Sequence, residues 1–445
     1  MLASETMETL IHSSLFRISS DFVFLYPLIM THVWIVGALF YHFKWERSQP
    51  LIPPILPEYP PLSILLPCHN EGDNVRETIH WLLQQNYPHY EIIAINDGSK
   101  DNTGAILNEL AAQQPNLRVV HFATNQGKAM GLRMGALVSP HEYLVCIDGD
   151  AILDPHACTW MMWHFLSSPV VAAVTGNPRI RNRSTLLGKI QVGEFSSIVG
   201  MIKRAQRIYG RVFSVSGVVA AFRKSALHRV GYWSTDMITE DVDITWKLQR
   251  DHWDVRFEPN AKCWILMPET LRGLWKQRLR WAQGGAEVFL RNADVLVHWR
   301  QGRMWLVFLE LCASMAWVYM LAGVTVVTAV SWLFNDTPTL SIKPDFLDIG
   351  STAGIVVLTC LIQFAVGFYL DGRYEKGLWK KFFWIIWYPF VYWIIVACTT
   401  FVGLPKALLK KRGQRAVWIS PDRGVKQSID EMSEGKINSN RGIRL

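Results

Sequence analysis

The sequence lacks the patterns that several common functional classes require. Its seven cysteines include no C-x-x-C pair, and no group of Cys and His residues has zinc-site spacing, so neither a zinc finger nor a disulfide scaffold is expected. No G-x-G-x-x-G follows a predicted strand, which argues against an ordinary dinucleotide-binding domain. The first residues include Glu5 and Glu8 rather than a basic stretch before a short apolar core, so no cleavable signal peptide is expected.

Charge is missing from four long apolar runs. Residues 22–43, 311–334, 349–370 and 382–404 contain no Asp, Glu, Lys or Arg. A helix needs about 20 such residues to cross a bilayer, and four runs of this length are hard to bury in one soluble core. The sequence therefore predicts four membrane segments, with Trp and Tyr crowding their ends as in interfacial belts.

The excess of positive charge, formally +8, lies partly beside these runs. Lys44 and Arg47 follow the first run whereas Asp21 precedes it, which predicts an outside N-terminus and a cytoplasmic region after the run. Basic residues flank the fourth run on both sides, so a kinked or re-entrant segment around Pro389, with a cytoplasmic C-terminus, fits better than one crossing. Charges at membrane flanks differ from the dense stripe of a nucleic-acid binder, so no nucleic-acid partner is expected.

Between the first and second runs, short apolar strands alternate with helical patterns. This alternation is typical of an α/β domain with a mostly parallel sheet. Strands are predicted at 62–66, 91–96, 118–122 and 143–147, and helices at 74–85, 103–114 and 128–137. The predicted division of the chain is an N-terminal membrane region at 1–49, an α/β domain at 50–303, a membrane region at 304–405 and a basic, polar tail at 406–445.

Acidic residues follow two of these strands, at the edge where ligands of parallel sheets collect. Asp148 and Asp150 flank a glycine after the strand at 143–147, and two carboxylates so placed suit Mg²⁺ held against a diphosphate. Asp97 follows the strand at 91–96 and could accept hydrogen bonds from a nucleobase or ribose. Each signal is weak alone, because Asp and Gly also form solvated turns and helix-entry caps.

Two further polar groups lie in neighbouring loops. Asn70 and Glu71 end the first strand, where they either meet a nucleoside or cap the next helix. Lys128 follows a glycine turn that suits a phosphate group, although an ordinary loop with an exposed lysine has the same pattern.

A third acidic motif, Thr239-Glu240-Asp241, precedes an amphipathic helical run. Helix N-termini favour hydroxyl and carboxylate side chains, so a capping function for Thr239 or Asp241 is one interpretation. The alternative interpretation makes one carboxylate a general base, whose pKa the surroundings would have to raise.

Residues 271–291 form a basic helical pattern that contains two tryptophans. The pattern is typical of an amphipathic helix lying on a membrane surface. Within it, Arg280 has the planar donor geometry that matches a leaving diphosphate. Trp281 offers a large apolar face on which a sugar ring can stack.

The order of the motifs carries more information than any one of them. D-G-S, D-G-D, T-E-D and Q-x-x-R-W follow one another between membrane segments, which resembles the processive family 2 glycosyltransferases, among them cellulose, hyaluronan and chitin synthases. The sequence around these motifs looks closest to the bacterial poly-β-1,6-N-acetyl-D-glucosamine synthases. That resemblance rests on Val145–Asp150, Val174–Ile180, Met237–Asp241 and Trp264–Thr270, continuing through Phe289.

The resemblance implies a GT-A fold for the α/β domain, inserted between transmembrane helices, and a role for each motif residue. UDP-sugar would be bound by Asp97, Asp148, Asp150 and Arg280, with Asn70, Glu71 and Lys128 as helpers. Asp148 and Asp150 would hold Mg²⁺, with Mn²⁺ as the alternative. Asp241 would be the catalytic base, and Glu240, Gln277 and Trp281 would bind the acceptor.

By the same resemblance, the protein would be a multi-pass protein of the bacterial inner membrane. It would polymerise N-acetylglucosamine from UDP-GlcNAc into a biofilm polysaccharide and couple synthesis to export. Its partners would be the growing polysaccharide, the lipid bilayer and a small membrane subunit through which cyclic di-GMP could act.

Three alternatives stay open at this stage. The first is another polymer of the chitin, hyaluronan or cellulose type, and the second is single transfer of a sugar to a lipid carrier. Product linkage and product length distinguish these from the expected polymer. The third is a non-catalytic membrane scaffold or sensor with a sugar-nucleotide fold, which would release no UDP.

Overall fold

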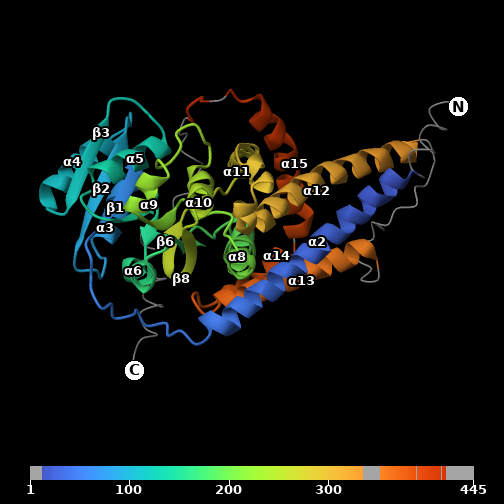
Figure 1. Ribbon diagram of the computed structural model, residues 1–445, viewed down its shortest axis with the longest axis horizontal. Coiled ribbons are helices and arrows are strands. Elements are labelled where there is room, and N and C mark those ends of the chain that lie inside the picture. Colours follow the sequence, from blue (N-terminus) through green and yellow to red (C-terminus); the bar gives the residue numbers. More distant parts are fainter. Residues whose placement is uncertain (1–12, 334–350, 387, 412, 417–445) are drawn as a thin grey trace.

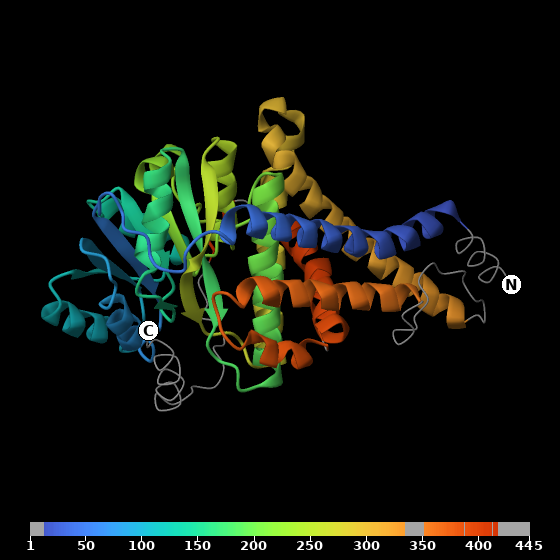
Figure 2. The same cartoon turned by 90° about the horizontal axis from the view of Figure 1, so that it is seen from below.

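The computed structural model describes residues 13–333, 351–386, 388–411 and 413–416. A central sheet with flanking helices occupies one side of the molecule, and a group of long helices extends away from it (Figures 1 and 2).

Eight strands form one sheet in the order β3-β2-β1-β4-β7-β6-β8-β5. Strands β1 to β4 run parallel to one another, whereas β7 is antiparallel to both of its neighbours and β5 is antiparallel to β8. The expected α/β sheet is therefore confirmed, and the carboxyl ends of β1, β2 and β4 meet at one edge. The strands are β1 (Leu62–Cys68), β2 (Tyr90–Asp97), β3 (Leu117–Phe122), β4 (Tyr143–Ile147), β5 (Ile152–Leu153), β6 (Val171–Ile180), β7 (Val219–Arg223) and β8 (Asp254–Ile265).

Apolar side chains along β1 assign helices to the two faces of the sheet. Ile64 and Leu66 pack in one cluster with α3 and α6, whereas Leu65 packs in another with α5 and α10. Successive strand residues point to opposite faces, so a wholly buried strand needs helices on both sides. These helices are α3 (Val75–Leu82), α4 (Thr103–Gln113), α5 (Lys128–Val138), α6 (Ala157–Ser167), α9 (Lys224–Arg229) and α10 (Glu240–Arg250).

Four helical segments are long and apolar enough to cross a membrane, by length and composition, among the described residues. Each overlaps one of the four predicted runs and extends beyond it at one or both ends, and the fourth segment begins only at Tyr392. Residues 334, 349–350 and 387 of the predicted runs lie outside the described residues. The segments lie in α2 (Ser14–Tyr41, continued by the π-helical η1, His42–Glu46), α12 (Gly302–Leu333), α13 (Thr352–Asp371) and α15 (Tyr388–Leu409), and the short α14 (Phe382–Ile385) precedes α15.

The fourth apolar run is broken. Helix α14 ends before α15 begins, and Pro389 is the second residue of α15, where a helix tolerates proline. Ile385, at the end of α14, packs against Gly193, and Lys410, just beyond α15, donates a 2.5 Å hydrogen bond to the Asp236 carbonyl. Both ends of this segment therefore contact the α/β domain.

One long helical element separates the sheet from the membrane-type helices. It consists of α7 (Leu186–Glu194), the π-helical η2 (Phe195–Met201) and α8 (Ile202–Tyr209), which follow one another without a break. Figure 2 shows this element in green, standing across the long helices. Short π-helical turns inside α-helices often accompany functional sites.

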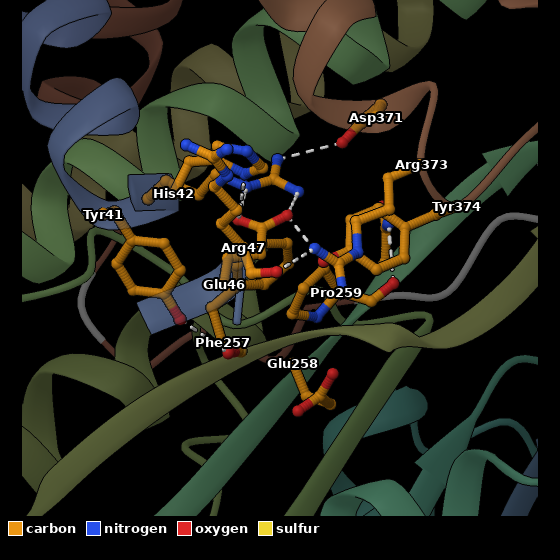
Figure 3. Close-up of polar contacts among 12 residues, drawn as sticks. Tyr41, His42, Glu46, Arg47, Phe257, Glu258, Pro259, Asp371, Arg373 and Tyr374 are labelled. Carbon is orange, nitrogen blue, oxygen red and sulfur yellow. Dashed lines mark hydrogen bonds and ion pairs between the residues drawn. The ribbon is translucent and has the colours of Figure 1, made fainter. Parts of the chain in front are cut away.

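Buried charges fasten α8 to the ends of two membrane-type helices. Arg204 of α8 bonds Glu46 at 2.7 and 2.9 Å and Asp371 at 2.9 Å, and all three side chains are at most 1% exposed. Arg179 of β6 bonds the other oxygen of Asp371 at 2.5 Å and Glu375 at 2.6 Å. Figure 3 shows Glu46 and Asp371 as sticks within this cluster. A buried charge needs such partners. One cluster of buried ion pairs therefore joins the α/β domain to the ends of α2 and α13.

Candidate active site

Lys128 joins two of the acidic motifs. It begins α5 directly after Gly127, and its Nζ lies 2.6 Å from Asp148 Oδ1 and 3.1 Å from Glu240 Oε1. A third contact, 3.1 Å, runs to the carbonyl of Gly217. Burial lowers the pKa of Lys128, but attraction to the two carboxylates outweighs burial and raises it. The lysine expected to help with phosphate thus links the start of α5 to the turn after β4 and to the start of α10.

Asp241 is held by two backbone amides. Gly217 N donates to Oδ2 at 3.1 Å and Val242 N donates to Oδ1 at 2.9 Å. Burial raises the pKa of this carboxyl to about 6, with Glu240 repulsion adding to the rise and Lys128 opposing it. A carboxylate with a pKa near the working pH can accept a proton and pass it on. Asp241 is therefore equipped as a general base.

The amide that fixes Asp241 belongs to a segment, residues 212–217, that docks along α10. Val215 N donates to Thr245 at 2.9 Å, and Trp246 Nε1 donates to the carbonyl of Phe213 at 3.1 Å. On the other side, Lys203 of α8 donates to Ser216 Oγ at 2.5 Å. Burial lowers the pKa of Lys203 to about 7, and the charge of Asp241 opposes this. The sequence offered no local signal for this segment or for Lys203.

Thr239 does not cap α10 with its side chain, which weakens the capping interpretation of the motif. A Cβ on Gly284 of α11 (Leu271–Arg291) would lie 2.3 Å from both Thr239 Oγ1 and Cγ2. Glycine therefore allows α11 to approach the start of α10. Helix α15 approaches α11 in the same way, since a Cβ on Gly403 would lie 2.9 Å from Gln283 N.

The D-G-D turn rests on the first strand's loop. A Cβ on Gly149 would lie 3.0 Å from Glu71 Cγ, and Thr78 donates to the Gly149 carbonyl at 2.9 Å. Glu71 is 1% exposed, and its amide donates to Thr103 Oγ1. Asp150 is 8% exposed. Glu71 thus lies against the turn that carries Asp148 and Asp150, and Thr78 holds that turn by a hydrogen bond.

Asp97 is fully buried at the end of β2. Its Oδ1 accepts from Gln126 N at 2.6 Å and its Oδ2 from Gly127 N at 2.9 Å, while burial raises its pKa. Asn70 accepts a hydrogen bond from Lys100 N and so ties the loops after β1 and β2 together. In this structure both residues shape the loops at the sheet edge.

Two of the predicted acceptor residues, Gln277 and Trp281, lie on α11 together with Arg280, which was predicted to bind the donor, whereas the third acceptor residue, Glu240, begins α10. Trp281 is half-buried, Arg280 is exposed, and Gln277 donates weakly to Met267 Sδ at 3.8 Å. Within the described part of the chain, none of these three α11 residues bonds to Asp148, Lys128 or Asp241. Helix α11 meets the T-E-D motif through Gly284, which lies against the Thr239 side chain, and through Glu287, which accepts a hydrogen bond from Ile238 N at 3.2 Å. Arg278, between the predicted residues, is buried against Glu194 at 2.7 Å.

The chain after α15 returns to the sheet edge. Ala416 N donates to the Thr235 carbonyl at 3.0 Å, and Arg415 bonds the side-chain oxygen of Gln126. A Cβ on Gly127, whose φ is +89°, would lie 2.6 Å from the Ala416 carbonyl. Residues 413–416, predicted as part of a polar tail, therefore border both the Asp97 loop and the segment that precedes Thr239. Nothing in their composition predicted this.

Asp148 and Asp150, which flank Gly149 just after β4, are the carboxylate pair predicted to hold a metal. The described residues contain no group of three His, Cys, Asp or Glu that could hold an ion unaided. Two carboxylates suit an ion that takes its remaining ligands from a phosphate and water. Asp148 already faces a cation, the Lys128 ammonium.

Comparisons with known proteins agree with this geometry. The family described as "Glycosyltransferase like family 2" matches residues 60–284. "Poly-beta-1,6-N-acetyl-D-glucosamine synthase" of Staphylococcus epidermidis is 40% identical over 91% of this chain and 98% of its own length. The protein of that name from Staphylococcus aureus (strain MSSA476) is 41% identical over 92% of this chain and 99% of its own length.

A solved structure supports the fold. The mannosyltransferase PcManGT from Pyrobaculum calidifontis, in complex with GDP-Man and Mn²⁺, superposes with a TM-score of 0.58 at 18% identity, covering 87% of this chain and 99% of that chain. The expected GT-A fold is thereby confirmed. On the match over residues 60–284 and the identity along nearly the whole chain, this protein belongs to the family 2 glycosyltransferases.

Proposed function

We propose that the protein polymerises N-acetylglucosamine from UDP-GlcNAc into poly-β-1,6-N-acetylglucosamine. The observation that carries this proposal is the 40% identity, over 91% of the chain, to a relative that bears the name of that synthase. The site geometry is in keeping with it, because Lys128 connects Asp148, on the expected donor side, with Glu240, beside the expected base.

In the proposed reaction, Asp241 accepts the proton of the acceptor's 6-hydroxyl group while that oxygen attacks the anomeric carbon of UDP-GlcNAc. The bond from that carbon to UDP breaks, UDP leaves with the electron pair, and the configuration inverts from α to β. A pKa raised to about 6 leaves Asp241 ionised at neutral pH and still basic enough to take the proton. Arg280 binds the charge that develops on the diphosphate.

Asp148 and Asp150 are proposed to hold Mg²⁺ or Mn²⁺. When bound, the ion would neutralise charge on the leaving diphosphate. The fold neighbour was solved with GDP-Man and Mn²⁺, and the carboxylate pair here has the oxygen ligands that such ions prefer. Glu71 would hold the turn that bears the pair, and Asp97 and Asn70 would shape the nucleoside side of the site.

The proposed location is the bacterial inner membrane, with the α/β domain in the cytoplasm. Basic residues follow α2 and flank the α14–α15 segment, as the positive-inside rule requires of cytoplasmic ends. The contacts of both ends of that segment with the α/β domain favour a re-entrant or interfacial path over a single crossing. Export of the polymer would run beside α11 and α15, with Trp281 at the entrance.

A small membrane subunit, through which cyclic di-GMP would activate synthesis, is proposed as a partner. Only the family resemblance supports this part. Purification from native membranes with and without cyclic di-GMP tests it, since a synthase that is equally active alone and in both conditions would contradict it.

The decisive experiment is synthesis by the purified full chain. We expect UDP-GlcNAc with Mg²⁺ or Mn²⁺ to give UDP and a long polymer whose linkage analysis shows β-1,6-linked N-acetylglucosamine. UDP-glucose and UDP-glucuronic acid serve as matched donors that should give no polymer. A different sugar, a different linkage or a single transfer would refute the proposal, and absence of UDP release would favour a non-catalytic scaffold.

A further inference from the structure

A cation lies under the proposed acceptor tryptophan. Arg278 stands one helical turn before Trp281 on α11, and its guanidinium carbon is 4.2 Å from the centre of the Trp281 ring. Residues three apart on a helix share a face, so this contact is part of the helix geometry. A guanidinium over an indole ring is attracted more strongly when water is excluded, and Arg278 is only 6% exposed.

A carboxylate in turn fixes the cation. Arg278 NH2 lies 2.7 Å from Glu194 Oε2, and the Glu194 side chain is only 5% exposed. Burial raises the pKa of Glu194, and the Arg278 charge offsets only part of this rise. The pairing rests on the 2.7 Å contact between the two buried side chains. The result is a stack of three groups, in which Glu194 holds Arg278 and Arg278 holds Trp281.

The base of the stack cannot shift easily. Glu194 is the last residue of α7, and a Cβ on its neighbour Gly193 would already lie 2.4 Å from Ile385 Cδ1. One turn earlier, Gln191 donates to the Pro268 carbonyl at 2.8 Å. Helix α7 is therefore held on two sides, and the orientation of Trp281 depends on a rigid support.

We propose that Glu194 and Arg278 are positioning residues that set the orientation of Trp281 toward the acceptor sugar. The inference rests on the proposed function and adds to it two residues that touch neither donor nor base. A buried ion pair is a weak source of stability compared with apolar packing of similar volume. Beyond any effect on stability, the pair holds the Arg278 guanidinium 4.2 Å from the Trp281 ring centre and so restricts the orientation of the indole.

The test uses the full chain in detergent micelles, with UDP-GlcNAc, Mg²⁺ and short β-1,6-linked N-acetylglucosamine oligosaccharides as acceptors. R278K keeps the charge but loses the planar group over the ring, and E194Q keeps the shape but loses the charge. We expect both variants to bind UDP within about twofold of the wild type. Their KM for the acceptor should rise about tenfold, and their products should be shorter.

R204K is the matched control. Arg204 lies on the same long helical element as Glu194 and, like Arg278, is a buried arginine paired with carboxylates, here those of Glu46 and Asp371. R204K should lower thermal stability without changing the acceptor KM or the product length. If R204K raises the acceptor KM as much as R278K does, the effect is general loosening and the inference fails.

The inference also fails if R278K and E194Q match the wild type in acceptor KM and product length. R278K decides alone if E194Q does not fold. A wild-type protein that makes no polymer from UDP-GlcNAc would instead refute the proposed function, and this inference with it.

Discussion

Replacing Gly284 by alanine should separate helix stability from active-site geometry. A new Cβ would lie 2.3 Å from both branches of Thr239 and 2.8 Å from its Cβ, so no rotamer of Thr239 clears it. Ordinary contact begins at 3.4 Å, which requires α11 and the start of α10 to part by about 1 Å. Alanine gains about 1 kcal/mol in helix propensity, whereas overpacking costs about 1–3 kcal/mol. The cost of the clash should therefore exceed the gain in helix propensity, and G284A should be less stable than the wild type.

The functional effect should exceed the effect on stability. A displacement of about 1 Å can cost about 10²-fold in rate, because Asp241 would no longer meet the acceptor held on α11. Polymer formation is measured as UDP release at saturating UDP-GlcNAc, beside the apparent melting temperature.

Gly285 provides the control in the next position of the same helix. A Cβ there would meet only Phe213 Cζ at 3.9 Å, which is ordinary contact. G285A should therefore raise the melting temperature and keep full activity. Equal activity of G284A and G285A would refute the view that close packing at Gly284 couples α11 to the base.

Four further outcomes are expected. D241N should keep UDP binding and lose about 10²- to 10⁴-fold in polymer formation, and full activity would remove Asp241 as the base. Because the raised pKa of Asp241 leaves it protonated below about pH 6, kcat/KM should fall about tenfold per pH unit below that value, and a flat profile from pH 5 to 7 would contradict this. D150A should weaken metal-dependent UDP binding measured by calorimetry, and binding that is unchanged by D150A and by EDTA would argue for a solvated turn. E46Q should lower the melting temperature, because it removes a charge from the buried ion pair with Arg204. E109Q is the control, because Glu109 belongs to an exposed ion pair whose loss should leave the melting temperature unchanged.

The fold was accessible from the sequence because its main signals are local. Wholly apolar strands such as β1 require helices on both faces, and this pattern is visible in the order of residues. Helix α11 was predicted with the bounds it has, since residues 271–291 follow a basic, amphipathic helical pattern. Pro389 and the charges at both ends predicted a kinked or re-entrant segment, and two separate helices, α14 and α15, lie in it.

The site was accessible only in part. The acidic motifs at strand ends could be found by position, and Lys128 was found as a helper. Its function as a link between Asp148 and Glu240 could not be, because that depends on side chains 112 positions apart in the chain. Lys203 and Glu194 lie inside a helix whose pattern marks them as ordinary polar residues. Only the packed structure shows that each faces a functional segment.

The buried charges around Arg204 bear on how such an enzyme can be divided or recombined. Glu46 precedes the α/β domain and Asp371 follows it, yet both neutralise an arginine within it. An excised domain would leave that arginine without its carboxylates, and a chimaera that exchanged only the domain would have to match them by chance. The transferable unit is therefore the domain together with the C-terminal ends of the α2–η1 helix and of α13. We therefore expect recombination to exchange the α/β domain successfully only when the segments that carry Glu46 and Asp371 are exchanged with it.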